Sequence, residues 1–191
     1  MRAPIIKNIW LALAVVAGAQ TLVLGYMLYD RIGLLQAGRE VVLPVVPVDP
    51  RSLFQGDYVI LSYAISRQTL PGLTGGQELV SGQPAYVTLA KAADGTWAQT
   101  AIGPAMPATL RPDDVVLRGR VVNQWIDGAN RQVMIDYGIE QYFVEEGRGR
   151  EIEEQVRDRK ITVLLAVDSN GRAAIKALLA DGTVRYREPL L

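Results

Sequence analysis

An uninterrupted apolar segment near the N-terminus constrains this chain more than any other feature. Residues 9–29, IWLALAVVAGAQTLVLGYMLY, contain no charged side chain over 21 positions. At about 1.5 Å of rise per residue, a helix of this length crosses the roughly 30 Å hydrocarbon core of a bilayer. Trp10 near one end and Tyr26 and Tyr29 near the other suit the aromatic belts found at membrane interfaces. The sequence therefore predicts one membrane-spanning helix.

A cleavable signal peptide is the competing interpretation of this segment. Arg2 and Lys7 form a basic amino-terminal region, and the small residues 17–19 supply a pattern that could be cleaved after Ala19. The apolar run continues through residues 21–29, however, and is longer than the roughly 7 to 15 apolar residues of a signal peptide. We therefore expect an uncleaved anchor.

The charges that flank the helix leave its orientation nearly balanced. Arg2 and Lys7 precede the apolar segment, and Arg31 and Arg39 follow it. A short basic tail is readily retained in the cytoplasm, whereas a long C-terminal domain is translocated largely regardless of its charge. We therefore expect the N-terminus in the cytoplasm and the following domain outside the inner (cytoplasmic) membrane.

Small residues gather on one face of the predicted helix. Spacings of three, four and seven residues place the following five on one stripe: Ala14, Ala17, Gly18, Thr21 and Gly25. Such a stripe lets a second helix approach closely, and the neighbouring amide of Gln20 could form an interhelical hydrogen bond. Packing against a multi-pass membrane partner is one hypothesis. The alternative is that alanine and glycine are simply common in membrane helices.

Two missing residue types narrow the chemistry of the chain. It contains no histidine and no cysteine, which excludes imidazole bases, thiol nucleophiles, disulfides and zinc fingers. The 20 basic and 20 acidic side chains give a formal net charge of zero, so nucleic acid is not an expected partner. The acidic pairs 113–114 and 145–146 lack the spaced ligand loop of calcium sites. We expect no metal and no cofactor.

The chain beyond the anchor has the pattern of antiparallel strands. Asp-Gly and Asn-Gly pairs are the strongest short-range hairpin signal, because these residues accept positive φ. Four such pairs occur, at 94–95, 127–128, 170–171 and 181–182. Runs rich in Val, Ile and Tyr alternate with turn residues at 41–48, 58–65, 85–90, 115–126, 133–137, 141–144, 161–167 and 173–179. We expect a mainly β fold, with the anchor in residues 1–38 and one β-rich domain in residues 39–191.

Three stretches depart from the strand pattern. Residues 31–38 should prolong the membrane helix, with Gly38 as its terminator. Residues 149–160 place apolar side chains four apart beside an oppositely charged pair of the same spacing, which predicts a short amphipathic helix. Residues 68–83 contain four glycines and a proline, which predicts a surface loop.

The most specific motif lies in residues 40–63, EVVLPVVPVDPRSLFQGDYVILSY. It resembles the bacterial GDYXXLXY family, whose defined motif positions are all filled here, by Gly56, Asp57, Tyr58, Leu61 and Tyr63. The preceding VDPR at 48–51 and the later YGIE at 137–140 and YFVEEG at 142–147 are also similar to that family. The resemblance implies a membrane-anchored bacterial protein of uncharacterised function that accompanies multi-pass membrane proteins. It brings no catalytic residues.

The motif strand alternates its side chains between two faces that are both largely apolar. This pattern predicts a central strand that is covered on both sides, with Leu61 and Tyr63 in the core. Tyr58 should pack under a loop or helix with its hydroxyl hydrogen-bonded.

Polar residues at the motif form the candidate binding site. Asp49, Arg51 and Asp57, with Tyr58 and Tyr63, could recognise a ligand or a partner. The alternative is structural, because a carboxylate beside a guanidinium often forms an ion pair that braces a turn.

Two kinds of hydrolase remain compatible with this composition. A carboxylate-pair enzyme could use Asp57 with Glu145 or Glu146, since such chemistry needs two acids about 5 to 10 Å apart. A Ser-Lys signal peptidase is rejected, because Ser52 lies too close to Gly56 and the lysines have no accompanying motif. We therefore expect a non-catalytic interaction module of the bacterial envelope. The alternative is an envelope ligand-binding or carboxylate-dependent hydrolytic domain.

Overall fold

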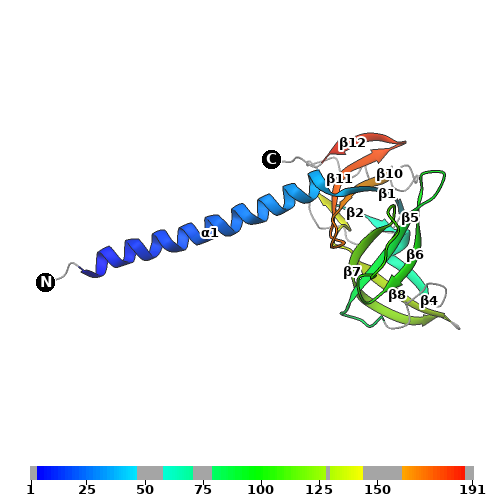
Figure 1. The fold of residues 1–191 in the computed structure, drawn as a ribbon, viewed down its shortest axis with the longest axis horizontal. Helices are drawn as coiled ribbons and strands as arrows, with labels where there is room; N and C mark the ends of the chain where they lie inside the picture. The colour runs from blue at the N-terminus through cyan, green and yellow to red at the C-terminus, as the bar shows by residue number, and fades with distance from the viewer. Residues whose placement is uncertain (1–3, 47–57, 71–78, 128–129, 144–160, 188–191) are drawn as a thin grey trace.

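The computed structural model describes residues 4–46, 58–70, 79–127, 130–143 and 161–187. Within these ranges the chain forms one long helix, α1 (Pro4–Ala37), followed by strands that gather at its C-terminal end (Figure 1). A short 3-10 helix, η1 (Ala64–Ser66), interrupts them. The predicted fold class, an N-terminal helix followed by a mainly β antiparallel region, is confirmed.

Helix α1 is long and apolar enough to span a membrane, by its length and composition. Its 34 residues correspond to roughly 51 Å, more than a hydrocarbon core requires, so the helix extends beyond residues 9–29 as predicted. It ends at Ala37, and the backbone N–H of Gly38 donates to the carbonyl of Leu34 at 3.0 Å. A Cβ atom on Gly38 would lie 2.9 Å from the backbone nitrogen of Val167, so glycine lets the helix end lie against a strand.

The first sheet has the strand order β12-β11-β10-β1-β3, and its neighbours are antiparallel. Strand β1 (Arg39–Val46) follows the helix directly and pairs with β10, with Arg39 opposite Val167. The other strands of this sheet are β3 (Ser62–Tyr63), β10 (Ile161–Val167), β11 (Ala173–Ala180) and β12 (Thr183–Arg187).

The second sheet has the order β4-β8-β7-β5-β6 and is also antiparallel. Its strands are β4 (Arg67–Leu70), β5 (Pro84–Lys91), β6 (Trp97–Gly103), β7 (Val115–Asp127) and β8 (Asn130–Asp136). A separate pair consists of β2 (Tyr58–Ile60) and β9 (Gln141–Phe143).

All four predicted hairpins are confirmed by the pairing of the strands that flank them. The Asp-Gly and Asn-Gly pairs lie between β5 and β6, β7 and β8, β10 and β11, and β11 and β12. Gly95, Gly171 and Gly182 have φ of +86°, +82° and +75°, which a side chain would strain. The local turn chemistry therefore accounts for these three turns, while residues 128–129, between β7 and β8, lie outside the described residues.

The prediction of one central strand at 58–65 is wrong. The segment is divided at Leu61, so that β2 pairs with β9 while β3 forms an edge of the first sheet. Leu61 is nevertheless held, because its N–H donates to the carbonyl of Glu140 at 2.8 Å. The predicted burial of Leu61 and Tyr63 is confirmed, since each is 1% exposed.

Other predicted boundaries change where pairing overrides local composition. The loop predicted at 68–83 begins later, because Gln68–Leu70 belong to β4 and pair with β8. Strands β6 and β12 were not predicted, since they have few buried residues and little apolar alternation. The helix predicted at 149–160 lies outside the described residues.

One hydrophobic cluster joins the two five-stranded sheets. Its buried side chains include Val41 and Leu165 from the first sheet and Val87 and Leu117 from the second. The packing is close enough that a Cβ atom on Gly119 of β7 would lie 2.5 Å from a methyl carbon of Ile135. The two sheets therefore share a core, and the end of α1 packs against β10 and β11 of the first sheet.

Candidate functional site

The last turns of α1 pack against the β10–β11 hairpin. Leu34 and Leu35 are buried and contact the buried Ala174 of β11, forming a small cluster apart from the main core. The side chains of residues 9–28 are exposed along the rest of the helix. The domain is thus attached to the helix through a packed junction that lies just beyond the apolar segment.

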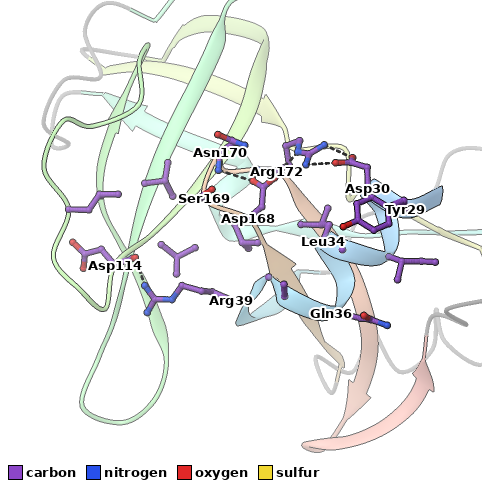
Figure 2. A pocket seen from close by; sticks show the side chains of 18 residues that line it. Tyr29, Asp30, Leu34, Gln36, Arg39, Asp114, Asp168, Ser169, Asn170 and Arg172 are labelled. Carbon is purple, nitrogen blue, oxygen red and sulfur yellow. Dashed lines mark hydrogen bonds and ion pairs between the residues drawn. The ribbon is translucent and has the colours of Figure 1, made fainter. Parts of the chain in front are cut away.

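An ion pair closes this junction. Asp30 of the helix accepts two hydrogen bonds from the guanidinium of Arg172, at 2.6 Å and 3.0 Å. The Nε atom of Arg172 donates to Asp168 at 2.7 Å (Figure 2). Arg172 therefore bridges two carboxylates, in the forked geometry that gives arginine pairs their directionality.

The turn that carries Arg172 is shaped by Asp168. The Oδ1 atom of Asp168 accepts the backbone N–H groups of Asn170 at 2.9 Å and Arg172 at 2.8 Å, while Oδ2 holds the Arg172 side chain. The positive φ of Gly171 completes the turn. One carboxylate thus fixes both the hairpin turn and the side chain that contacts the helix.

Two further contacts hold the chain that leaves the helix. Arg39 donates from Nη1 to the carbonyls of Pro112 at 2.8 Å and Asp114 at 3.0 Å, just before β7. Glu40 accepts from Lys176 of β11 at 2.7 Å. The helix end is therefore attached to both sheets.

A cleft of about 830 Å³ lies between the helix end and the domain (Figure 2). Tyr29 and Asp30 line it from the helix, Leu110 and Asp114 from the segment before β7, and Asn170 from the hairpin turn. Tyr29 is the last residue of the uncharged segment. The cleft therefore lies at the level where the helix would leave a bilayer.

The second half of the GDYXXLXY motif contacts the YGIE segment. The hydroxyl of Tyr63 donates to the carbonyl of Ile139 at 2.7 Å, and Leu61 bonds to Glu140 as described above. In return, the hydroxyl of Tyr137 donates to the carbonyl of Ile65 at 2.8 Å. Burial raises the pKa of both tyrosines, which stay protonated donors. The two sequence segments therefore brace one another.

The side chain of Glu140 forms hydrogen bonds within the YGIE loop. Its carboxyl group accepts the backbone N–H groups of Tyr137 at 2.7 Å and Ile139 at 2.8 Å. Burial raises the pKa of Glu140 to about 7, helped by a hydrogen bond with Asp136. The same hydrogen bond lowers the pKa of Asp136, whose Oδ1 accepts the N–H of Gly138 at 2.8 Å. Both carboxyl groups therefore hold backbone N–H groups of this loop, which is a structural role.

Comparison with known proteins identifies the family. The model for the GDYXXLXY protein family matches residues 20–178, from the second half of α1 into β11. The chain belongs to the GDYXXLXY family. No curated protein and no solved structure matches it. The matched range includes Asp30, Asp168 and Arg172, so the junction lies within the part of the chain that defines a GDYXXLXY protein.

The predicted binding residues of this GDYXXLXY protein are only partly described. Asp49, Arg51 and Asp57 lie outside the described residues, as do Glu145 and Glu146. Tyr58 pairs through its backbone with Phe143, and its side chain lies outside the description. Binding through these residues stays a prediction. Tyr63 lies in the core, with its hydroxyl on Ile139.

The predicted small-residue stripe lies on the exposed part of α1. Nothing lies within 4 Å of a Cβ atom placed on Gly18 or Gly25, and Thr21 donates to the carbonyl of Ala17 within the helix. At 100° per residue, Asp30 lies about 140° around the axis from Gly25. The contact with Arg172 therefore leaves that side of the GDYXXLXY helix open.

The junction itself was not predicted from the sequence. Asp30 is the first charged residue after the apolar segment, and Asn170-Gly171 marks a hairpin, but neither signal indicates that the two meet. Among the residues that the structure describes, no group of acidic side chains is arranged to hold a metal ion in this GDYXXLXY protein.

Proposed function

We propose that this protein is a membrane-anchored interaction module whose helix and β domain act as one unit in the bacterial envelope. The observation that carries the proposal is the junction: Arg172 bridges Asp30 and Asp168, and Leu34 and Leu35 are buried beside it. A simple tether needs only a linker. A packed and ion-paired junction fixes the orientation of a domain relative to its membrane helix, which a subunit of a membrane complex requires.

The proposed orientation has the N-terminus in the cytoplasm and the domain outside. The chain has no cysteine, so one introduced thiol reports its own location. Thr183→Cys on the exposed strand β12 should react with a membrane-impermeant maleimide in intact spheroplasts. Labelling only after the membrane is permeabilised would reverse the assigned orientation.

The proposed partner is a multi-pass membrane protein that packs on the stripe of Ala14, Ala17, Gly18, Thr21 and Gly25. The stripe is open within this chain, and small residues allow the close helix contact by which membrane helices associate. The ion pair with Arg172 uses another side of the helix, so both contacts can exist together. The domain would then be presented to the extramembrane part of the same partner.

Crosslinking in native membranes, followed by mass spectrometry, tests the partner. Ala17→Leu adds bulk to the stripe and should reduce the yield of the crosslinked complex. Ala12→Leu is the matched control, because Ala12 lies about five turns before Asp30 and so shares its side of the helix. Recovery of the protein alone in both wild type and variants, or equal loss with both substitutions, would contradict the stripe as the contact.

A further inference from the structure

A second hollow, of about 500 Å³, lies on the other side of the hairpin turn from the junction cleft. Three arginines line it, Arg118 and Arg120 from β7 and Arg172 from the turn. Asp136 contributes a carboxylate to the same lining. The hollow therefore has an excess of positive side chains, although the chain as a whole has a formal net charge of zero.

The strand register explains why the arginines gather here. Arg118 and Arg120 are two residues apart on β7, so both side chains lie on the same face, and both are exposed. Strand β8 ends with Asp136 opposite Arg120. The turn between β10 and β11 lies beside β7 at the next position, where the N–H of Arg118 donates to the carbonyl of Gly171 at 2.7 Å. The hollow is the gap between the end of β8 and that turn.

The existing contacts occupy two of the three arginines. Arg172 is held by Asp30 and Asp168, and Arg120 donates to the carbonyl of Gly82 at 3.2 Å and lies near Asp136. Among the described residues the guanidinium of Arg118 has no hydrogen-bond or ion-pair partner. A bound anion would relieve the repulsion between the two neighbouring guanidiniums of β7.

The position of the hollow relative to the bilayer indicates which anions lie near it. Asp30 directly follows the uncharged segment, so it lies where the headgroup layer, roughly 5 to 7 Å thick, begins. Arg172 bonds to Asp30 and also lines the hollow, which places the hollow beside that layer. Phosphate groups are therefore the anions closest to these arginines, and the guanidinium fork matches their oxygens.

We propose that Arg118 and Arg120, beside Arg172, form a binding site for a phosphate group. Two sources carry this chemistry, an anionic phospholipid headgroup and a soluble phosphate. Only the lipid source rests on the proposed membrane anchoring. Binding of soluble phosphate would be independent of it, so the two proposals can fail separately.

Thermal unfolding of the full chain in detergent tests the site itself. Inorganic phosphate, compared with chloride at equal ionic strength, should raise the unfolding temperature by about 3 °C at about ten times the Kd. R118Q/R120Q should abolish the shift, because losing two charged hydrogen-bond donors should weaken binding by about a hundredfold or more. Arg185→Gln on the exposed strand β12 removes the same kind of charge elsewhere and should keep the shift.

Native mass spectrometry of the full chain distinguishes the sources. Protein released from nanodiscs of phosphatidylcholine mixed with phosphatidylglycerol should retain phosphatidylglycerol, and R118Q/R120Q should lose it. A phosphate-induced shift without retained lipid assigns the site to soluble phosphate. R118K/R120K keeps both charges and should keep part of the shift, which separates loss of charge from loss of fold. An equal shift in wild type and R118Q/R120Q, or neither shift nor retained lipid, overturns the proposal.

Discussion

Asp30 and Arg172 are 142 residues apart in the sequence, and their side chains form a two-pronged ion pair at 2.6 Å and 3.0 Å. The pair joins helix α1 to the tip of a hairpin. Asp168 holds the same guanidinium and also shapes the turn, so the hairpin itself orients Arg172 toward the helix. The position of the strands relative to α1 thus depends on a few identifiable contacts.

Removing the bridge should loosen the junction while the domain stays folded. Arg172→Gln loses the pairs with Asp30 and Asp168, but these side chains are partly exposed, so the unfolding midpoint should change little. Spin labels on cysteines introduced at Leu24 and Thr183 should show a broader distance distribution in the variant. The exposed Arg185→Gln is the control. An unchanged distribution would mean that the other contacts of the helix end fix the domain without this ion pair.

Replacing either of two glycines near the helix end by alanine should change stability in opposite directions. Gly38→Ala places a Cβ atom 2.6 Å from the carbonyl oxygen of Leu34, and backbone atoms cannot rotate away, so it should cost about 1 to 3 kcal/mol. Gly33→Ala meets nothing within 4 Å and should stabilise the helix by up to about 1 kcal/mol. Hydrogen exchange at the junction measures both. Slower exchange in Gly38→Ala would contradict the close approach.

Tyr63→Phe tests the contact between the two motif segments. The substitution keeps the ring but leaves the buried carbonyl of Ile139 without its donor, so the free energy of unfolding should fall by about 1 to 3 kcal/mol. Chemical denaturation of the full chain in detergent measures the loss. Tyr186→Phe on β12 changes the same group at a partly exposed ring and should have a smaller effect. Equal effects would remove the case for a special role of the Tyr63 hydroxyl.

The raised pKa of Glu140, beside Asp136, predicts a pH-dependent stability. The pKa of Glu140 is about 7 in the folded protein, above its ordinary value of 4.5, so folding favours the protonated form. The stabilisation is therefore complete below about 4.5 and is lost as the pH rises through about 7. Arg120 and the buried Tyr63 and Tyr137 also surround this pair.

Asp136→Asn isolates this effect. Asparagine still accepts the N–H of Gly138 and can donate to Glu140, so the ionised glutamate no longer faces a second carboxylate. Denaturation midpoints measured from pH 4.5 to 7 should slope downward for the wild type and less steeply in the variant, because burial of Glu140 remains and only the contribution of Asp136 is lost. Asp113→Asn, at an exposed position, should retain the full slope. A slope as steep in Asp136→Asn as in the wild type would mean that Asp136 does not contribute to the pH dependence.

Local chemistry made much of the fold predictable. The extension of the helix to Ala37 and the four hairpins follow from apolar length and from residues that accept positive φ, which act within a few positions. The predicted strands at 115–126 and 161–167 correspond closely to β7 and β10 for the same reason. Burial of Leu61 and Tyr63 was also visible in their spacing.

The division of the motif strand was not visible in that spacing. An apolar segment has the same sequence pattern whether it pairs within one sheet or is shared between two sets of strands. The two parts are separated by the hydrogen bond from Leu61 to Glu140 and by the pairing of β2 with β9. Strands β6 and β12 likewise form because neighbouring backbone groups need partners, although few of their own side chains are buried.

The sequence by itself determined that this chain begins with an apolar helix long enough to cross a membrane and continues as antiparallel hairpins. The tertiary structure alone decided that Asp30 meets Arg172 and that Arg118 and Arg120 line one hollow. It also decided that Tyr63 supports the YGIE loop. The difference lies in sequence separation, because hydrophobic length and turn preference are properties of neighbouring residues. Contacts across more than a hundred positions depend on how the sheets pack and leave no pattern along the chain.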